Sequence, residues 1–274
     1  MSPSRTIGFI GAGNMARAMI GGLLRAHVRA ATELVASDAD AAARERIAAE
    51  HGVRVHAENR AVVRESRTVV LAVKPQVMDA VLSGIADEIT PDHLVISIAA
   101  GVTLARLARG LGERVAAGRL VRAMPNTPAL IGEGITAWCA RGAISAADAD
   151  TVAHVFGAVG RSHTVAHEGL LDAVTGLSGS GPAYVFLFLE ALSDAGVREG
   201  LPRDLADQLA TQTVLGAARM VDATGLGFAA LKGQVTSPGG TTIAGLAELE
   251  RGAVRSAVFD AVRAATRRSQ ELGG

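Results

Sequence analysis

The sequence predicts an α/β domain over residues 1–165 followed by an all-α domain over residues 166–274. Up to about residue 165, short β-branched runs alternate with helical patterns, which is typical of a parallel sheet covered by helices. Beyond that point the strand patterns cease. With 274 residues, of which 49% are hydrophobic and 20% charged, the chain can bury the core of one large or two ordinary domains.

The first strand pattern, residues 6–10, leads into a glycine turn at the start of a helical pattern. In a dinucleotide-binding (Rossmann-like) turn, Gly11 would permit the tight turn, and Gly13 would let the backbone approach a pyrophosphate. The small Ala16 suits the place where such a helix meets the sheet. A plain glycine-rich turn is the alternative. The cofactor-binding residues predicted here are Gly11, Gly13, Asn14 and Met15.

The second strand pattern ends at Ser37 and Asp38, where a dinucleotide-binding fold meets the adenosine ribose. Asp38 could accept a hydrogen bond from the ribose 2′-OH, which would favour NAD. No arginine directly follows, and Arg44 and Arg46 on the next helix are expected to form a solvated face. These residues leave the choice between NADPH and NADH open.

Two further β-branched runs, residues 68–73 and 94–98, end in polar or small residues. The carboxyl ends of strands in open α/β sheets face the crevice that binds ligands, and small residues there would allow a nicotinamide close to the backbone. A short helix opens at Asn59 between the second strand pattern and these runs. The cofactor-binding residues predicted in this region are Asn59, Ala72, Val73, Lys74, Pro75, Ala99, Ala100 and Gly101.

The end of the first half adds a strand pattern and a loop stiffened by two prolines, residues 120–128. Strands are expected over residues 135–139 and 162–165, with a helix over about 145–158 between them. His163 and His167 have a spacing that could place two metal ligands on one helix face, but the residues between them read as strand. No metal site is predicted.

The second half begins with a helical pattern over residues 182–195 that is apolar nearly all round, with Gly196 as its expected end. Further helices are expected from Leu201 to near Gly225 and over about residues 253–271. Helices this apolar, in a domain of about a hundred residues, lack enough partners within one chain. The all-α C-terminal domain is therefore predicted to be a dimerisation domain.

Residues 235–242, Val-Thr-Ser-Pro-Gly-Gly-Thr-Thr, precede an apolar helical pattern over residues 243–249. The glycines let a ligand approach the backbone, and the N–H groups of a first helical turn favour a carboxylate or phosphate. Ser237, Thr241 and Thr242 could add hydroxyls to this anion site. The alternative is that Ser237 or Thr241 only caps the helix.

The segment from Leu231 to Glu250 resembles the signature of pyrroline-5-carboxylate reductases. The resemblance continues, in the same order, through other motifs over essentially the whole chain. They are the glycine turn, Val-Lys-Pro-Gln at 73–76, Met-Pro-Asn-Thr-Pro at 124–128 and the glycine-serine break at 176–181.

The resemblance implies reduction of 1-pyrroline-5-carboxylate to L-proline, by hydride transfer from NADPH, with NADH possible, to the ring C5. It implies that Ser37 receives the cofactor's 2′-phosphate. It also implies that Ser237, Gly239 and Gly240 bind the substrate carboxylate, while the catalytic Thr242 hydrogen-bonds the ring nitrogen. Family members interlock their helical domains, so a homo-oligomer, at least a dimer, is expected, with each active site built between two chains.

Two alternatives from other classes remain. A β-hydroxyacid dehydrogenase would carry a lysine on the first long helix of its second domain, whereas residues 182–195 contain none and Lys232 comes much later. A dinucleotide-sensing regulator without turnover would keep the glycine turn but would have no use for the anion site at 235–242.

Composition excludes several partners. Basic and acidic residues number 27 each and are spread along the chain, so nucleic acid is not an expected partner. Cys139 is the single cysteine and the first residues show no leader pattern, so a cytoplasmic location is expected. The most apolar run, residues 183–192, is shorter than a membrane span and contains Glu190, so no transmembrane segment is expected.

Overall fold

The computed structural model describes residues 6–273 except 113–114 and 116–118. The chain forms two compact units. Unit 1 consists of Met1–Ser180 together with Ala264–Gly274, and unit 2 consists of Gly181–Arg263. The eleven C-terminal residues thus belong with the first half of the chain. These units do not coincide with the residue ranges 1–165 and 166–274, and that domain boundary stays a prediction.

Unit 1 is built on one eight-stranded sheet with the order β3-β2-β1-β4-β5-β6-β7-β8. All neighbouring strands are parallel except β6 and β7, which are antiparallel. The strands are β1 Ile7–Ile10, β2 Leu34–Ser37, β3 Arg54–His56, β4 Thr68–Leu71, β5 Leu94–Ser97, β6 Leu120–Met124, β7 Gly134–Ala140 and β8 Gly160–Thr164.

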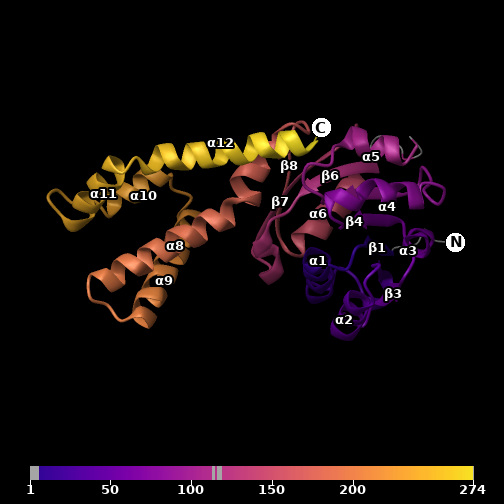
Figure 1. Cartoon of the computed structure of the whole chain (residues 1–274), viewed down its shortest axis with the longest axis horizontal. Coiled ribbons are helices and arrows are strands. Elements are labelled where there is room, and N and C mark those ends of the chain that lie inside the picture. The colour runs from indigo at the N-terminus through magenta and orange to yellow at the C-terminus, as the bar shows by residue number, and fades with distance from the viewer. Residues whose placement is uncertain (1–5, 113–114, 116–118, 274) are drawn as a thin grey trace. The chain divides into compact units, whose positions relative to one another are not determined.

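Helices cover both faces of this sheet (Figure 1). Successive side chains of β4 point to opposite faces of the sheet, so Val70 lies in one hydrophobic core and Val69 and Leu71 lie in the other. The core around Val70 includes residues of α1, α2 and α6, and the opposite core includes residues of α3, α4, α5 and α7. The bounds are α1 Asn14–Arg25, α2 Ala41–His51, α3 Asn59–Glu65, α4 Met78–Ile85, α5 Leu104–Gly110, α6 Ala146–Gly157 and α7 Leu170–Val174.

Two features of the sheet were not expected from the sequence. The edge strand β3 has three residues, two of them polar, and is too short to show a hydrophobic alternation. The antiparallel direction of β7 was also not foreseen, because both strand directions produce similar apolar runs. The other predicted strands and the helix over about 145–158 are confirmed with small shifts of their ends.

Unit 2 is all-helical. Its helices are α8 Gly181–Arg198, α9 Arg203–Thr224, α10 Phe228–Gln234, α11 Thr241–Arg251 and the first part of α12 Val254–Gly273. Gly225 ends α9 in the left-handed conformation, with φ 65°. The expected end of α8 at Gly196 is wrong, since the helix continues to Arg198. A methyl group on Gly196 would lie 3.2 Å from the Ala206 side chain, so this glycine permits close packing of α8 on α9.

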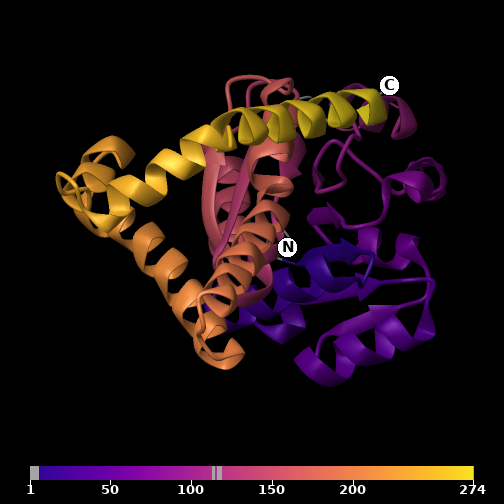
Figure 2. The same ribbon diagram turned by 60° about the vertical axis from the view of Figure 1, so that its left-hand side comes forward.

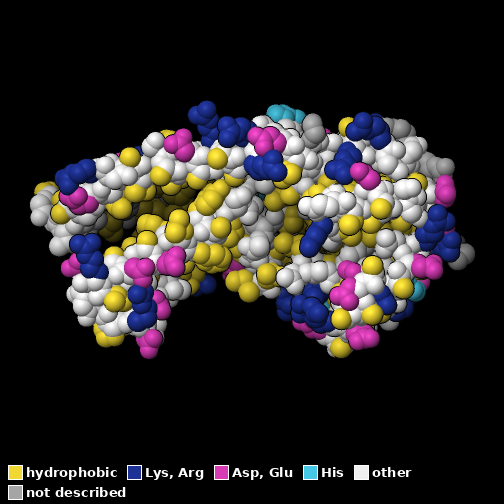
Figure 3. All heavy atoms as spheres, viewed as in Figure 1, with side chains coloured by type: hydrophobic (Ala, Val, Ile, Leu, Met, Phe, Trp, Pro, Cys, Tyr) yellow, Lys and Arg dark blue, Asp and Glu magenta, His cyan; other side chains and the backbone are white. Residues whose placement is uncertain are grey.

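Apolar side chains lie exposed over much of unit 2, for example along α8 (Figure 3). Phe186, Leu187, Phe228 and Phe259 are each more than half exposed. In the described part of the chain, no single helix is long and apolar enough to cross a membrane. The pair α9 and α10, bent by 118°, passes that test together on length and composition alone.

Candidate active site

The strand register brings four loops of unit 1 to one edge of the sheet. Ile10 is level with Ser37 and with Leu71, and Leu71 is level with Ser97. The loops that follow β1, β2, β4 and β5 therefore begin side by side. Strand β1 lies between β2 and β4, which is the position where the strand order reverses and where open α/β sheets bind ligands.

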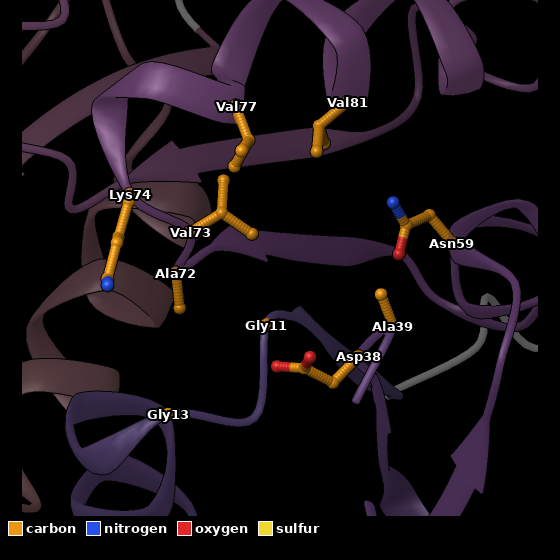
Figure 4. Close-up of a pocket in the computed structure, with 10 residues that line it drawn as sticks. All are labelled: Gly11, Gly13, Asp38, Ala39, Asn59, Ala72, Val73, Lys74, Val77 and Val81. Carbon is orange, nitrogen blue, oxygen red and sulfur yellow. The ribbon is translucent and has the colours of Figure 1, made fainter. Parts of the chain in front are cut away.

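A pocket of about 420 Å³ opens at this edge (Figure 4). It receives residues from the glycine turn, from the end of β2, from the start of α3 and from the segment between β4 and α4. The lining residues are Gly11, Gly13, Asp38, Ala39, Asn59, Ala72, Val73, Lys74, Val77 and Val81.

The two glycines of the turn have different roles. Gly11 has φ +101°, and a methyl group there would lie 2.6 Å from the carbonyl oxygen of Ala72. Its N–H donates to the carbonyl oxygen of Ser37 at 2.7 Å, so the turn is held against β2. Around Gly13, by contrast, no described heavy atom lies within 4 Å of a methyl position. The fold thus requires Gly11, while Gly13 leaves space that a ligand can occupy.

Asp38 supports the glycine turn and faces the pocket. Its carboxylate accepts hydrogen bonds from the N–H of Ala12 at 2.8 Å and from the N–H of Asp40 at 2.9 Å. Figure 4 shows this carboxylate directed toward the glycine turn. Arg44 was expected on a solvated face; it is partly exposed there, and its guanidinium also donates to the carbonyl oxygens of Asp38 and Ala39 at 2.7 and 3.0 Å.

The Ser37 hydroxyl is engaged inside the protein. This residue is fully buried and donates a hydrogen bond to Asn59 Oδ1 at 2.8 Å. The bond orients the Asn59 side chain, which lines the pocket next to Asp38. Ser37 therefore acts on the pocket by positioning Asn59.

The structure brings together part of the predicted cofactor set. Gly11, Gly13, Asp38, Asn59, Ala72, Val73 and Lys74 line the pocket, whereas Asn14, Met15, Ser37, Pro75, Ala99, Ala100 and Gly101 lie outside its lining. Ala39, Val77 and Val81 were missed. The last two lie four residues apart around the start of α4, so their helical spacing after Pro75 was the available signal.

The predicted anion site lies in unit 2 and is formed by the turn before α11. Gly239 has φ +68°, and the N–H of Gly240 donates to the carbonyl oxygen of Ser237 at 3.1 Å. Gly240 is the N-cap of α11, and among the described residues no side chain forms a capping hydrogen bond to the start of this helix. The first-turn N–H groups are therefore not taken by Ser237 or Thr241, which is the condition for binding an anion.

The hydroxyls of this turn are accessible. Ser237 is exposed and Thr242 is partly buried, in the first turn of α11. The Ser237 hydroxyl occupies the place that a side chain at position 240 would need, so glycine at 240 keeps that hydroxyl in the turn. A carboxylate here would meet backbone N–H groups, two hydroxyls and the positive end of the helix dipole.

Cys139 is the only thiol of the chain and is buried on β7. Burial raises the pKa of this thiol to about 11, so it is protonated at neutral pH. Among the described residues, no group of three or more His, Cys, Asp or Glu side chains could hold a metal ion.

Two family models match the chain. The model described as pyrroline-5-carboxylate reductase dimerisation matches residues 168–272. The model described as NADP oxidoreductase coenzyme F420-dependent matches residues 6–101.

Full-length relatives are similar to the whole chain. A pyrroline-5-carboxylate reductase of Pisum sativum is 44% identical, covering 99% of this chain and 97% of that protein. The corresponding enzyme of Synechocystis is 46% identical, covering 97% and 98%. A crystal structure of the Plasmodium falciparum pyrroline carboxylate reductase with NADP bound has a TM-score of 0.86 at 33% identity, covering 98% of both chains. The Coxiella burnetii enzyme has a TM-score of 0.92 at 36% identity, covering 99% and 100%.

Proposed function

The chain belongs to the pyrroline-5-carboxylate reductase family, and on that premise we propose how its residues share the reaction. It is an NAD(P)H-dependent reductase that converts 1-pyrroline-5-carboxylate to L-proline in proline biosynthesis. The main support for the residue assignments is the start of α11 after Gly239 and Gly240, where no side chain caps the first-turn N–H groups. These N–H groups can bind a carboxylate, and the other unit of the chain has a pocket that fits a dinucleotide.

The pocket of unit 1 fits a dinucleotide. The open space at Gly13 has room for a pyrophosphate against the first turn of α1, and Asp38 and Asn59, which line the pocket, are assigned to the ribose of the adenosine half. Ala72 to Pro75 and Ala99 to Gly101 follow the neighbouring strands and are assigned to the nicotinamide half. Asn14 and Met15 complete the proposed contacts, and Ser37 belongs to the proposed set through its hydrogen bond to Asn59. When bound, the reduced nicotinamide supplies the hydride that the ring C5 accepts.

The substrate's carboxylate is assigned to Ser237 and to the amides of Gly239 and Gly240. Thr242 is proposed to hydrogen-bond the ring nitrogen and thereby to orient C5. A ring imine that arrives protonated needs no acid from the protein, so binding and orientation provide most of the catalysis. This explains why the site requires no lysine on α8, in contrast to the β-hydroxyacid dehydrogenase alternative.

The chain self-associates through its helical part, which matches the dimerisation model over residues 168–272. The exposed apolar residues of α8 belong to this part. We retain two further proposals from the sequence. Residues 1–165 would serve the cofactor and residues 166–274 the substrate and dimerisation, and the enzyme would work in the cytoplasm.

The test is oxidation of NADPH or NADH, followed by absorbance, when 1-pyrroline-5-carboxylate is added to the purified protein. Thr242→Ala should lower kcat by roughly one to three powers of ten, the cost of a lost orienting hydrogen bond. Ser237→Ala should mainly raise KM for the imine, because a carboxylate contact is made equally in ground and transition states. Thr241→Ala, in the same helical turn, is the matched control. Wild-type turnover in Thr242→Ala would remove this threonine from the mechanism.

A further inference from the structure

A buried ionic cluster lies in unit 1 away from the pocket lining. Arg122, on β6, is only 4% exposed. Its guanidinium binds Glu168 Oε1 at 2.9 Å and Asp172 Oδ1 at 3.3 Å, and the Ser269 hydroxyl donates to the same Asp172 oxygen at 2.7 Å. We refer to these four residues as the Arg122 cluster. Burying a guanidinium is costly unless several partners satisfy it, so this arrangement is strongly specified.

The cluster joins segments that are far apart in the chain. Glu168 lies two residues before α7 and Asp172 lies in its first turn, while Ser269 lies on the last part of α12, where the chain has returned to unit 1. Glu168 Oε1 also accepts the N–H of Leu104, the first residue of α5, at 2.7 Å. The end of α12 is thereby tied to β6, α7 and α5.

One turn beyond Ser269, α12 packs on the loop that follows β5. A methyl group on Gly101 would lie 2.9 Å from the Leu272 Cβ and 3.2 Å from the Leu272 carbonyl carbon. Gly273 approaches the same loop, since a methyl group there would lie 3.5 Å from Thr103 Cγ2. Figures 1 and 2 both show the end of α12 beside α5. The left-handed Gly101, with φ +73°, allows this close approach.

This loop is continuous with the edge of the sheet that carries the pocket. Ser97 is level with Leu71, and the N–H of Ile98 donates to the Leu71 carbonyl oxygen at 3.2 Å. Ala72, the next residue of that neighbouring strand end, lines the pocket. A displacement of residues 99–101 is therefore a displacement next to the part of the pocket assigned to the nicotinamide.

We propose that Arg122 and Ser269 are positioning residues, which hold the last turn of α12 against Gly101 and so set the loop that orients the nicotinamide. The proposal rests on the proposed function for the assignment of residues 99–101. A purely structural cluster would affect stability alone. Loss of a positioning cluster must change the nicotinamide end of the bound cofactor and leave the adenosine end unaltered, because the described hydrogen bonds of Asp38 and of the glycine turn go to residues outside the cluster.

The chain offers a matched control for Ser269. Ser145 donates to Asp148 at 2.9 Å, and Asp148 binds Arg119 at 3.1 Å, which is another serine–aspartate–arginine group in unit 1. Ser269→Ala and Ser145→Ala remove the same kind of bond, and Ser145 also caps α6. Ser145→Ala should therefore destabilise the protein at least as much as Ser269→Ala does. Ser269→Thr keeps a hydroxyl at this position and tests whether the hydroxyl alone restores the wild-type properties.

Cys139 supplies a reporter for the cluster itself. It faces Arg122 in the register of β6 and β7, it is 6% exposed, and the charges of Glu168 and Arg122 both act on its thiol. Opening of the cluster should accelerate the reaction of the Cys139 thiol with a disulfide reagent such as dithiobis-nitrobenzoate. Cys139 should therefore react several-fold faster in Ser269→Ala than in the wild type, and at the wild-type rate in Ser145→Ala.

The deciding comparison uses the full-length dimer of each variant. Ser269→Ala should lower kcat by about three- to thirtyfold and change the fluorescence of bound NADPH. It should bind 2′,5′-ADP, which lacks the nicotinamide, within twofold of the wild type. Ser269→Thr should restore kcat, and Ser145→Ala should leave kcat and NADPH fluorescence unchanged. Unchanged kcat and fluorescence in Ser269→Ala, with only stability lost, would overturn the proposal. Inactivity of the wild type would instead contradict the proposed function, and the fluorescence comparison decides the positioning role without turnover.

Discussion

Replacing Gly13 with alanine should separate cofactor binding from folding. Gly13 has φ −73° and ψ −176°, which alanine adopts readily, and no described atom lies within 4 Å of the added methyl group. Two small effects oppose each other. Reduced freedom of the unfolded chain contributes about 0.4–1 kcal/mol, and alanine is a poorer N-cap than glycine by a similar amount. The net change in unfolding free energy should stay within about 1 kcal/mol.

Cofactor affinity should fall much further. The methyl group would fill the space through which a pyrophosphate reaches the N–H groups at the start of α1. A charge-assisted hydrogen bond contributes about 1.5–3 kcal/mol, so losing one raises Kd by roughly ten- to a hundredfold. The measurements are a calorimetric titration with NADPH and a thermal melt, in which Tm should move by no more than about 4 °C.

Gly11→Ala is the contrasting variant. Its φ of +101° strains alanine, and the methyl group would lie 2.6 Å from the Ala72 carbonyl oxygen, so this change should destabilise the protein whether or not cofactor is present. The reasoning is refuted if Gly13→Ala binds NADPH within twofold of the wild type. It is also refuted if Gly13→Ala unfolds as readily as Gly11→Ala.

Three other predictions follow from single residues. Asp38→Asn removes a negative charge beside the ribose position, so the ratio of the NADPH Kd to the NADH Kd should fall several-fold in titrations; an unchanged ratio would show that Asp38 does not discriminate. Phe186, 65% exposed on α8, should lie in the dimer interface, so Phe186→Glu should give monomers or aggregates in analytical ultracentrifugation, and an active, stable dimer would contradict this. Burial disfavours the Cys139 thiolate in the folded state and so raises the pKa of this thiol to about 11. The stability that the protonated thiol retains in the folded protein is fully present below the ordinary thiol pKa near 9 and is lost as pH rises through 11. Wild-type stability in urea should therefore fall by up to about 2–3 kcal/mol more than that of Cys139→Ala over this range, and parallel profiles would refute the assignment.

Local patterns predicted the parts of the fold that are themselves local. The glycine turn, the buried runs of β1, β4 and β5 and the end of α9 near Gly225 all follow from residues that are neighbours in the chain. The direction of β7 does not, because it depends on which strand edge is free when the chain returns to the sheet. The continuation of α8 through Gly196 is another example, since this glycine serves packing against Ala206 and not helix termination.

The same distinction applies to the site. The pocket residues that directly follow strands, such as Ala72 and Asp38, could be predicted because parallel strands bring their carboxyl ends to one edge. The roles of Ser37 and Arg44 could not, because they depend on side-chain hydrogen bonds whose partners are set by side-chain direction. Its place at the end of β2 led to the prediction that Ser37 binds the cofactor, but could not indicate that its hydroxyl is engaged with Asn59.

Arg122 shows where a sequence signal ends and three-dimensional information begins. A charged residue inside the apolar strand pattern of β6 already indicates a buried group that must have partners. Which partners it has cannot be derived locally. Glu168 and Asp172 come from the start of α7 and the residues just before it, and Ser269 comes from a segment that returns to unit 1 after residues 181–263. The returning segment contains a serine in an amphipathic helix, a residue that no pattern distinguishes from a solvent-exposed one. Its proposed role follows from its hydrogen bond to Asp172, one turn before Leu272, where the end of the chain packs on Gly101.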